Sequence, residues 1–318
     1  MGKIYDTVVI GNGPAGLTAA IYAVRAGYQT LVVSEDPSGG GQIARTYEVA
    51  NYPGLNGISG MELGEKFREH AKALGAEELL DHVSAIEKAE DSSSEEGDIP
   101  LLTVVTGNDR LLAKSVIIAT GASHRKLGVP GEERLSGSGV SYCATCDGGF
   151  FRNKTVAVVG GGDVALEDAI YLSRFAEKVF IIHRRDEFRG VKALQRELLS
   201  NEKIEPIYDT IVTEIEGDMS VSSLKLKNVK TNEESSLPVN GIFVAVGIRP
   251  NLEGIEGLPE LDEAGYIKAD ESCVTSIPGI FAAGDVRTKA LRQVITAAAD
   301  GANAVTSIGR YFTEEGKR

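Results

Sequence analysis

Two cysteines three positions apart, Cys143 and Cys146, are followed immediately by a carboxylate, Asp147. Such a pair can form a redox-active disulfide, supply half of a zinc site, or remain as two inert thiols. Zinc needs two further ligands, and neither Cys273 nor any of the four histidines stands at a ligand spacing. We therefore expect no metal and a redox disulfide beside which Asp147 manages protons, with a helix N-cap as the alternative role for Asp147.

Composition limits the classes of function that this chain can have. Its 318 residues are enough for two domains of ordinary size. The 33 basic and 46 acidic residues give a formal net charge of −13, which argues against nucleic acid or an anionic membrane as a main partner. Three cysteines do not make a secreted disulfide scaffold. We expect a soluble cytoplasmic protein with a catalytic cysteine pair.

A glycine-rich turn near the start of the chain predicts a dinucleotide site. A β-branched strand runs into Gly11-Asn12-Gly13-Pro14-Ala15-Gly16, and an alanine-rich helix follows. Gly11 allows the tight turn, Gly13 lets the backbone approach a pyrophosphate, and Gly16 lets helix and strand pack closely. The next strand leads to Glu35, 19 residues beyond Gly16, where a carboxylate can accept hydrogen bonds from ribose hydroxyls.

The same strand, turn and helix return after the cysteine pair. A second β-branched strand leads into Gly160-Gly161-Gly162-Asp163-Val164-Ala165 and a helical segment. The strand that follows ends in His183-Arg184-Arg185, with Arg189 four residues further on, at the place that Glu35 has in the first unit. Guanidinium groups can bind the 2′-phosphate of NADP bidentately, whereas a carboxylate would repel it. The second site is expected to prefer NADPH over NADH.

The order of these units predicts that one domain is inserted into another. Further strand-like segments lie between the two glycine turns and again after the second turn. We predict an α/β protein of two Rossmann-like, three-layer ββα nucleotide-binding domains. The outer domain covers residues 1–123 and 249–318, and the inserted domain covers 124–248 and carries the cysteine pair. The polar run at 91–98 is expected to form an exposed loop.

Short motifs keep a specific order and spacing along essentially the full length of the chain. They are G-N-G-P-A-G at 11–16, G-G-Q at 40–42, N-Y-P-G at 51–54, A-T-G at 119–121, C-A-T-C-D-G at 143–148, the triple glycine with Asp163, H-R-R-D-E-F-R at 183–189, F-A-A-G-D-V at 281–286 and R-Q at 292–293. This combination resembles the low-molecular-weight, bacterial-type NADPH-dependent thioredoxin reductases. In that family the outer domain holds FAD, and the inserted domain holds NADPH and the redox disulfide.

The resemblance implies cofactor contacts for residues of this chain. For FAD these include the pyrophosphate turn, an acid at the adenosine ribose and an aspartate at the ribityl chain: Gly11, Gly13, Pro14, Ala15, Gly16, Glu35, Gly41, Gln42, Asn51, Val83, Thr120, Gly121, Gly284, Asp285, Arg292, Gln293 and Val294. For NADPH they are Gly160, Gly162, Asp163, Val164, Ala165, His183, Arg184, Arg185 and Arg189. Val164 departs from the small hydroxyl residue that is usual in the family, which removes one hydrogen bond to the NADPH pyrophosphate.

The stretch from Arg292 to Val294 opens an alanine-rich segment of helical character. The free N–H groups and the positive dipole end of such a helix can face a flavin and stabilise the negative charge of its reduced form. Packing of the helix in the core is the alternative interpretation, and both can hold.

The resemblance also implies a reaction, the reduction of thioredoxin. NADPH reduces FAD, the reduced flavin reduces the Cys143–Cys146 disulfide, and the resulting dithiol reduces a disulfide of thioredoxin. Cys146 is the thiol on the flavin side, and Cys143 attacks the partner through a mixed disulfide. Because the cysteines cannot serve flavin and an external protein at once, the inserted domain is expected to rotate about the crossings near His124 and at 247–251. A homodimer is implied as well.

Two other functions remain open. A related flavin disulfide reductase would use another donor or acceptor, such as ferredoxin, oxygen or another thiol protein; ferredoxin-dependent relatives lack the second glycine turn and its arginines. A non-catalytic scaffold would use nucleotides for stability alone, and the cysteine pair in register with both turns argues against it. Cys273, in a strand-like context, is expected to be part of the core.

Overall fold

The structure is a computed structural model that describes residues 3–46, 48–49, 51–55, 57–89 and 99–315. The loop expected at 91–98 lies outside these residues. The chain divides into two units, unit 1 (residues 1–123 and 249–318) and unit 2 (residues 124–248). Two short paired strands, β7 (Ala122–His124) and β16 (Ile248–Pro250), carry the chain between the units.

Unit 1 is built on a mixed sheet of the order β3-β2-β1-β6-β5-β4, in which β17 also pairs with β6. The pairs that involve β1, β2, β3 and β17 are parallel, and β4–β5 and β5–β6 are antiparallel. The strands are β1 (Ile4–Ile10), β2 (Thr30–Ser34), β3 (Glu77–Leu80), β4 (Val83–Lys88), β5 (Leu102–Thr106), β6 (Arg110–Ile118) and β17 (Ile280–Ala282). The helices are α1 (Pro14–Arg25), α2 (Gly60–Ala73) and α6 (Val294–Glu315), with 3-10 turns η1 (Gly41–Arg45) and η3 (Gly284–Val286).

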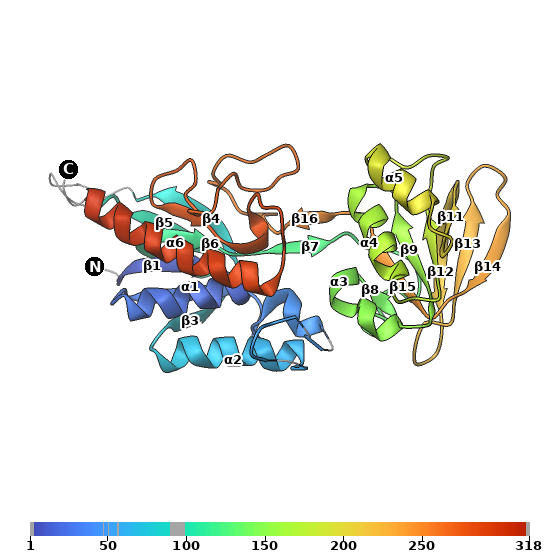
Figure 1. Cartoon of the computed structure of the whole chain (residues 1–318). Coiled ribbons are helices and arrows are strands. Elements are labelled where there is room, and N and C mark those ends of the chain that lie inside the picture. Colours follow the sequence, from blue (N-terminus) through green and yellow to red (C-terminus); the bar gives the residue numbers. More distant parts are fainter. Residues whose placement is uncertain (1–2, 47, 50, 56, 90–98, 316–318) are drawn as a thin grey trace. The chain divides into compact units, whose positions relative to one another are not determined.

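The parallel strands of unit 1 are buried on both faces, which explains their continuous β-branched sequences. Val9, Val32 and Ile117 point to one face and pack against α1 and α6, which lie side by side (Figure 1). The alternate residues, such as Val8 and Val33, belong to a second core layer on the opposite face, shared with β4 and β5. This alternation gives unit 1 its layers.

Unit 2 has a parallel sheet of the order β11-β10-β9-β15-β8 and a separate antiparallel sheet, β12-β13-β14. The parallel strands are β8 (Val140–Ser141), β9 (Thr155–Gly160), β10 (Lys178–Ile182), β11 (Ile204–Ile207) and β15 (Gly241–Ala245). The others are β12 (Thr210–Glu216), β13 (Ser223–Asn228) and β14 (Glu234–Pro238). The helices are α3 (Ala144–Asp147), α4 (Asp163–Ser173) and α5 (Lys192–Leu199), with a 3-10 turn η2 (Gly148–Phe151).

The parallel sheet of unit 2 separates two core layers. Val158 and Ile181 pack with residues of α4 and α5, whereas Val159 and Ile182 pack with the antiparallel sheet on the other face. This is the three-layer ββα arrangement that the sequence predicts (Figure 1). No helix of the described residues is long and apolar enough to cross a membrane.

Cys273 is buried in the core of unit 1, as expected, and its neighbour Val274 forms an isolated β-bridge with Phe281, but Cys273 itself is not in a strand. It lies in a turn with a φ of +62°, and its N–H donates to Asp270 O at 2.9 Å. The Asp270 carboxylate accepts from the backbone N–H of Ser272. This hydrogen bond between the Asp270 side chain and the nearby backbone stabilises the turn, which outweighs the β propensity of the neighbouring residues.

Candidate active site

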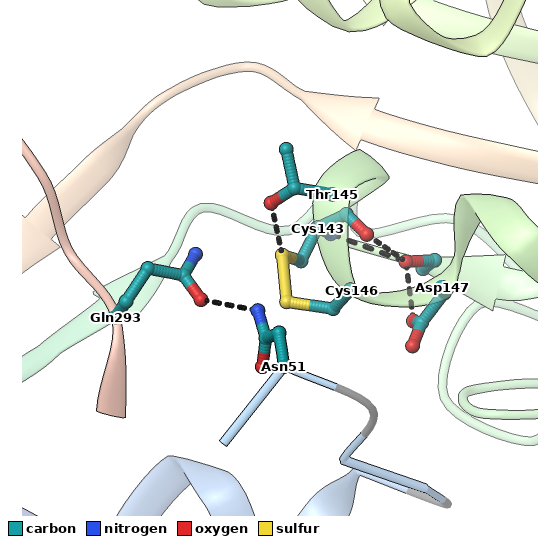
Figure 2. Close-up of a disulfide and its surroundings, with 7 residues drawn as sticks. Asn51, Cys143, Thr145, Cys146, Asp147 and Gln293 are labelled. Carbon is teal, nitrogen blue, oxygen red and sulfur yellow. Dashed lines mark hydrogen bonds between the residues drawn. A yellow bond between two sulfur atoms is a disulfide. The ribbon is translucent and has the colours of Figure 1, made fainter. Parts of the chain in front are cut away.

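Cys143 and Cys146 form a disulfide across α3, a single helical turn of unit 2 (Figure 2). Their Cα atoms are 5.3 Å apart, and Cys143 occupies the N-cap position of the helix. Both cysteines are partly buried, whereas Thr145 between them is exposed. The Thr145 hydroxyl lies 3.4 Å from Cys143 Sγ, a contact marked by a dashed line in Figure 2. The remaining cysteine, Cys273, is a free thiol in unit 1.

Asp147 ends α3 and is partly buried. Burial raises the pKa of Asp147, and a hydrogen bond from Ser141 opposes that rise. Asp147 also precedes η2, but its side chain makes no capping hydrogen bond in the described structure, so the alternative role of N-cap finds no support. A carboxyl whose pKa is raised keeps its proton to a higher pH than an ordinary aspartate, which suits a group that donates and accepts protons.

The first glycine turn joins β1 to α1 and needs two of its three glycines for packing. A Cβ on Gly11 would lie 2.5 Å from Ala119 O, and a Cβ on Gly16 would collide with the carbonyl oxygen of Gly11. A Cβ on Gly13 would meet no described atom closer than 4.0 Å. Pro14 then starts α1 without needing an N–H partner. The turn therefore leaves room for a phosphate at the N-terminus of α1.

Segments that are distant in sequence meet at this turn. A Cβ on Gly41 would lie 3.3 Å from Gly13 Cα, and a Cβ on Gly284 would lie 2.8 Å from Ala15 Cβ. The end of β2 is adjacent as well, because Gly11 N–H donates to Val33 O at 2.8 Å. The turn, η1 and η3 thus form one cradle in unit 1, made from three parts of the chain.

Among the buried polar atoms of unit 1 that have no hydrogen-bond partner within the described residues are Asp285 Oδ1, Thr120 Oγ1 and Arg292 Nε. Burial raises the pKa of Asp285, and the cations Lys289 and Arg292 act against it. Buried polar atoms are normally satisfied, so these atoms are available to the polar groups of a bound ligand. Together with the cradle, they fit the phosphates and hydroxyls of FAD.

The other predicted FAD residues have varied surroundings. Glu35 is exposed directly beyond β2, Gln42 is exposed in η1, and Gly121 has a φ of +71°. Asn51 Nδ2 donates to Gln293 Oε1 at 3.0 Å (Figure 2), so these two side chains lie together. α6 begins at Val294, immediately after Gln293. The side chain of Val83 is buried in the core, which leaves only its backbone for contact with a ligand.

The second glycine turn joins β9 to α4. A Cβ on Gly162 would meet no described atom within 4 Å, whereas a Cβ on Gly160 would lie 2.6 Å from Ala165 Cβ. Ala165 is fully buried, and the 58% exposed Val164 points away from the core. Asp163 Oδ1 accepts from Val191 N–H at 2.7 Å, which ties the turn to the loop after β10.

The loop after β10 places three exposed arginines, Arg184, Arg185 and Arg189, on the unit that carries this turn. Arg189 N–H donates to Gly161 O at 2.7 Å, so the loop folds back onto the turn. His183 differs from the arginines, because its ring is buried against Gly161. Burial lowers the pKa of His183, with Arg189 adding to the effect. The arginines, rather than the histidine, supply positive charge here.

Two features near these sites were not found from the sequence. Ser141 contacts Asp147, and no pattern in the sequence marks it. In α6, Asp300 is almost completely buried and accepts from Gly284 N–H, Arg287 Nη2 and Lys289 Nζ at 2.8, 2.7 and 2.8 Å. A lone carboxylate in the alanine-rich stretch 297–304 was the signal that could have revealed this buried ion-pair network.

Comparison with known proteins places the chain in a family. Residues 5–301 match the model of the pyridine nucleotide-disulphide oxidoreductases. The chain is 46% identical to thioredoxin reductase of Listeria innocua over 98% of this chain and 95% of that protein, and 44% identical to that of Bacillus subtilis over 98% and 96%. The crystal structure of thioredoxin reductase from Streptococcus pyogenes matches with a TM-score of 0.89 at 44% identity, covering 98% of this chain and 99% of the other. The chain therefore belongs to the pyridine nucleotide-disulphide oxidoreductases and, among them, to the bacterial-type thioredoxin reductases.

Proposed function

We propose that this protein is an NADPH-dependent thioredoxin-disulfide reductase that contains FAD. The observation that carries the proposal is the Cys143–Cys146 disulfide beside the partly buried Asp147, in a unit whose glycine turn is followed by exposed arginines. When bound, NADPH supplies a hydride and FAD relays its two electrons, so that NADPH, one proton and a protein disulfide become NADP⁺ and a protein dithiol.

Unit 1 is assigned to FAD and unit 2 to NADPH. In unit 1 the open side of Gly13 and the N-terminus of α1 receive the pyrophosphate, and Asp285 holds ribityl hydroxyls. In unit 2 the unobstructed Gly162 and the start of α4 receive the other pyrophosphate. Arg184, Arg185 and Arg189 bind the 2′-phosphate.

The two thiols of the opened disulfide divide the reaction with the partner. Cys143 Sγ attacks one sulfur of the thioredoxin disulfide, forms a mixed disulfide and releases the other thioredoxin sulfur as a thiolate. Cys146 Sγ then attacks Cys143 Sγ, which restores the Cys143–Cys146 bond and releases the second thioredoxin sulfur. Asp147 transfers the two protons of the dithiol to the two thioredoxin sulfurs.

The proposal includes motion, assembly and location. Cys146 faces the flavin in one half-reaction and Cys143 faces thioredoxin in the other, so unit 2 rotates about β7 and β16. The protein acts as a homodimer in the cytoplasm, where thiols stay reduced. Light scattering on the purified protein should give the mass of two chains; a mass of one chain would contradict the dimer.

The test is NADPH consumption by the purified FAD-loaded protein with a panel of oxidised thioredoxins from the same organism. Wild type should turn over with at least one of them. Cys143→Ser should lose this turnover while NADPH still bleaches its flavin, and Cys273→Ser is the matched control that keeps turnover. The proposal would be contradicted if NADPH were consumed with oxygen or ferredoxin but with none of the thioredoxins. Full turnover by Cys143→Ser would contradict it as well.

A further inference from the structure

Ser141 is a buried hydroxyl two residues before Cys143. It is the last residue of β8, which pairs in parallel with β15, so its backbone belongs to the sheet of unit 2. Only 5% of the residue is exposed. A hydroxyl at this depth needs hydrogen-bond partners within the protein, and those of Ser141 belong to the two groups to which we assign thiol chemistry.

The Ser141 hydroxyl contacts both Asp147 and the backbone of Cys143. Ser141 Oγ donates to Asp147 Oδ2 at 2.6 Å, a distance typical of a hydroxyl that donates to a carboxylate. The same oxygen accepts from Cys143 N–H at 3.1 Å. Cys143 O lies 3.4 Å away, but a hydroxyl has a single proton to donate, and the shorter contact goes to Asp147.

We propose that Ser141 is a positioning residue of thioredoxin reduction, which holds the Asp147 carboxyl and the backbone of Cys143 in one fixed relation. The inference rests on the proposed role of Asp147 as the group that exchanges protons. A strand residue is a firmer support for such geometry than a loop residue, because its backbone is bonded to neighbouring strands. Ser141 thus links the Asp147 carboxyl to the sheet of unit 2 and to the backbone of the nucleophile Cys143.

The residue that follows Asp147 packs against apolar side chains. Gly148 follows Asp147, and a Cβ there would lie 2.8 Å from the ring of Phe175 and 3.0 Å from Leu172. α3 packs chiefly against η2 and α4. η2 and β8 contain no titratable side chain, and those of α4 are Asp163, Glu167, Asp168 and Tyr171.

Removal of the Ser141 hydroxyl has a predictable direction. Burial raises the pKa of Asp147, and the bond from Ser141 lowers it because it stabilises the carboxylate. Without that bond the pKa of Asp147 rises further. Any limb of the pH profile that reports Asp147 must then move to higher pH, whether Asp147 is required as an acid or as a base.

The experiment is the pH dependence of kcat/KM for thioredoxin reduction by the FAD-loaded protein. The variant Asp147→Asn first identifies the limb of the profile that reports Asp147, because this limb should be absent in that variant. Ser141→Ala should move that limb up by about one pH unit, the effect of one charge-assisted hydrogen bond. Ser173→Ala is the matched control: Ser173 is also 5% exposed and bonds Ile170 O and Asn201 Nδ2, remote from the disulfide in sequence.

Further variants separate the possible failures. Ser141→Thr keeps the hydroxyl, so its limb should lie at the same pH as in wild type. In a protein that already carries Asp147→Asn, Ser141→Ala should cause no further change in the pH profile. If Ser141→Ala does not fold, Ser141→Gly removes the same hydroxyl and carries the same expectation. A folded variant without the hydroxyl but with an unmoved limb overturns the inference. If Asp147→Asn itself leaves the profile unchanged, it is the proposed role of Asp147 that fails.

Discussion

The two glycine turns of this chain follow the same order of strand, turn and helix, yet they pack differently. In the first turn, a side chain on Gly16 would collide with Gly11 O. In the second turn the corresponding residue is Ala165, whose Cβ fits because Gly160 has none. The helix of the first turn therefore lies closer to its turn, and the third glycine of the motif is a packing requirement there rather than a contact with nucleotide.

The charges of the two units differ as well. Unit 1 has 17 basic and 28 acidic residues, a net charge of −11, whereas unit 2 has 16 and 18, a net charge of −2. After the second strand of each motif, unit 1 exposes Glu35 and unit 2 exposes Arg184, Arg185 and Arg189. NADPH carries one more phosphate than NADH, so the nearly neutral unit with the arginines is the one suited to it.

Substitution at the first turn should have the largest effect on cofactor binding. Gly16→Ala forces α1 away from β1, and overpacking of this kind costs about 1–3 kcal/mol. We expect loss of FAD from the purified protein and a lower melting temperature. Gly162→Ala, which meets no described atom within 4 Å, is the matched variant and should keep both the yellow colour and the melting temperature. Equal losses in the two variants would remove the contrast between the turns.

Removal of positive charge at the second turn should have the next largest effect. Arg184→Gln and Arg185→Gln should each lower the affinity for NADP⁺ about tenfold or more, because each breaks hydrogen bonds between charged groups. Titration calorimetry with NADP⁺ and with NAD⁺ measures this, and binding of NAD⁺ should stay unchanged. Arg196→Gln, an exposed arginine of α5, is the control. A parallel loss for both nucleotides would assign the arginines to general binding.

The helices of the two turns differ in titratable groups, which predicts a pH-dependent stability. α1 contains no acidic residue, whereas burial raises the pKa of Asp168 in α4 to about 7, with Glu167 contributing. A carboxyl whose pKa is higher in the folded than in the unfolded state destabilises the fold as pH rises through that value. Asp168→Asn should therefore stabilise the protein by about 2–4 kcal/mol at pH 8.5 and change little at pH 4. Denaturant unfolding at both values checks this, and a pH-independent effect would contradict it.

The smallest effect concerns Val164, which is 58% exposed after Asp163. Val164→Thr adds a hydroxyl of nearly the same shape at the start of α4. One new hydrogen bond to the NADPH pyrophosphate should tighten NADP⁺ binding by about two- to tenfold. Val191→Thr, which is also exposed and next to α5, should leave it unchanged. Equal affinities in Val164→Thr and wild type would show that this side chain does not reach the nucleotide.

Much of the fold could be predicted from the sequence because the signals were local. β-branched strands, glycine turns and alanine-rich helices each lie within a few consecutive residues, as at Gly11 to Gly16. Cys273 shows where local signals fail: the Asp270 carboxylate accepts a hydrogen bond from Ser272 N–H and so stabilises a turn in a backbone that β propensity would extend.

The candidate site was predictable in its motifs but not in its contacts. The Cys143–Cys146 disulfide follows from spacing and resemblance. The contact between Ser141 and Asp147 depends on how β8 and α3 meet in space, and the bonds of Asp300 join η3 to α6. Such contacts depend on tertiary packing, which single-residue patterns do not record.

The central claim is that electrons from NADPH reach the Cys143–Cys146 disulfide, and a count of thiols tests it most directly. The FAD-loaded protein is mixed with NADPH without oxygen and then denatured in a thiol reagent. Before NADPH, only Cys273 is free, so one thiol per chain should react; after NADPH, all three cysteines should react. A count that stays at one while the flavin is reduced would contradict the account.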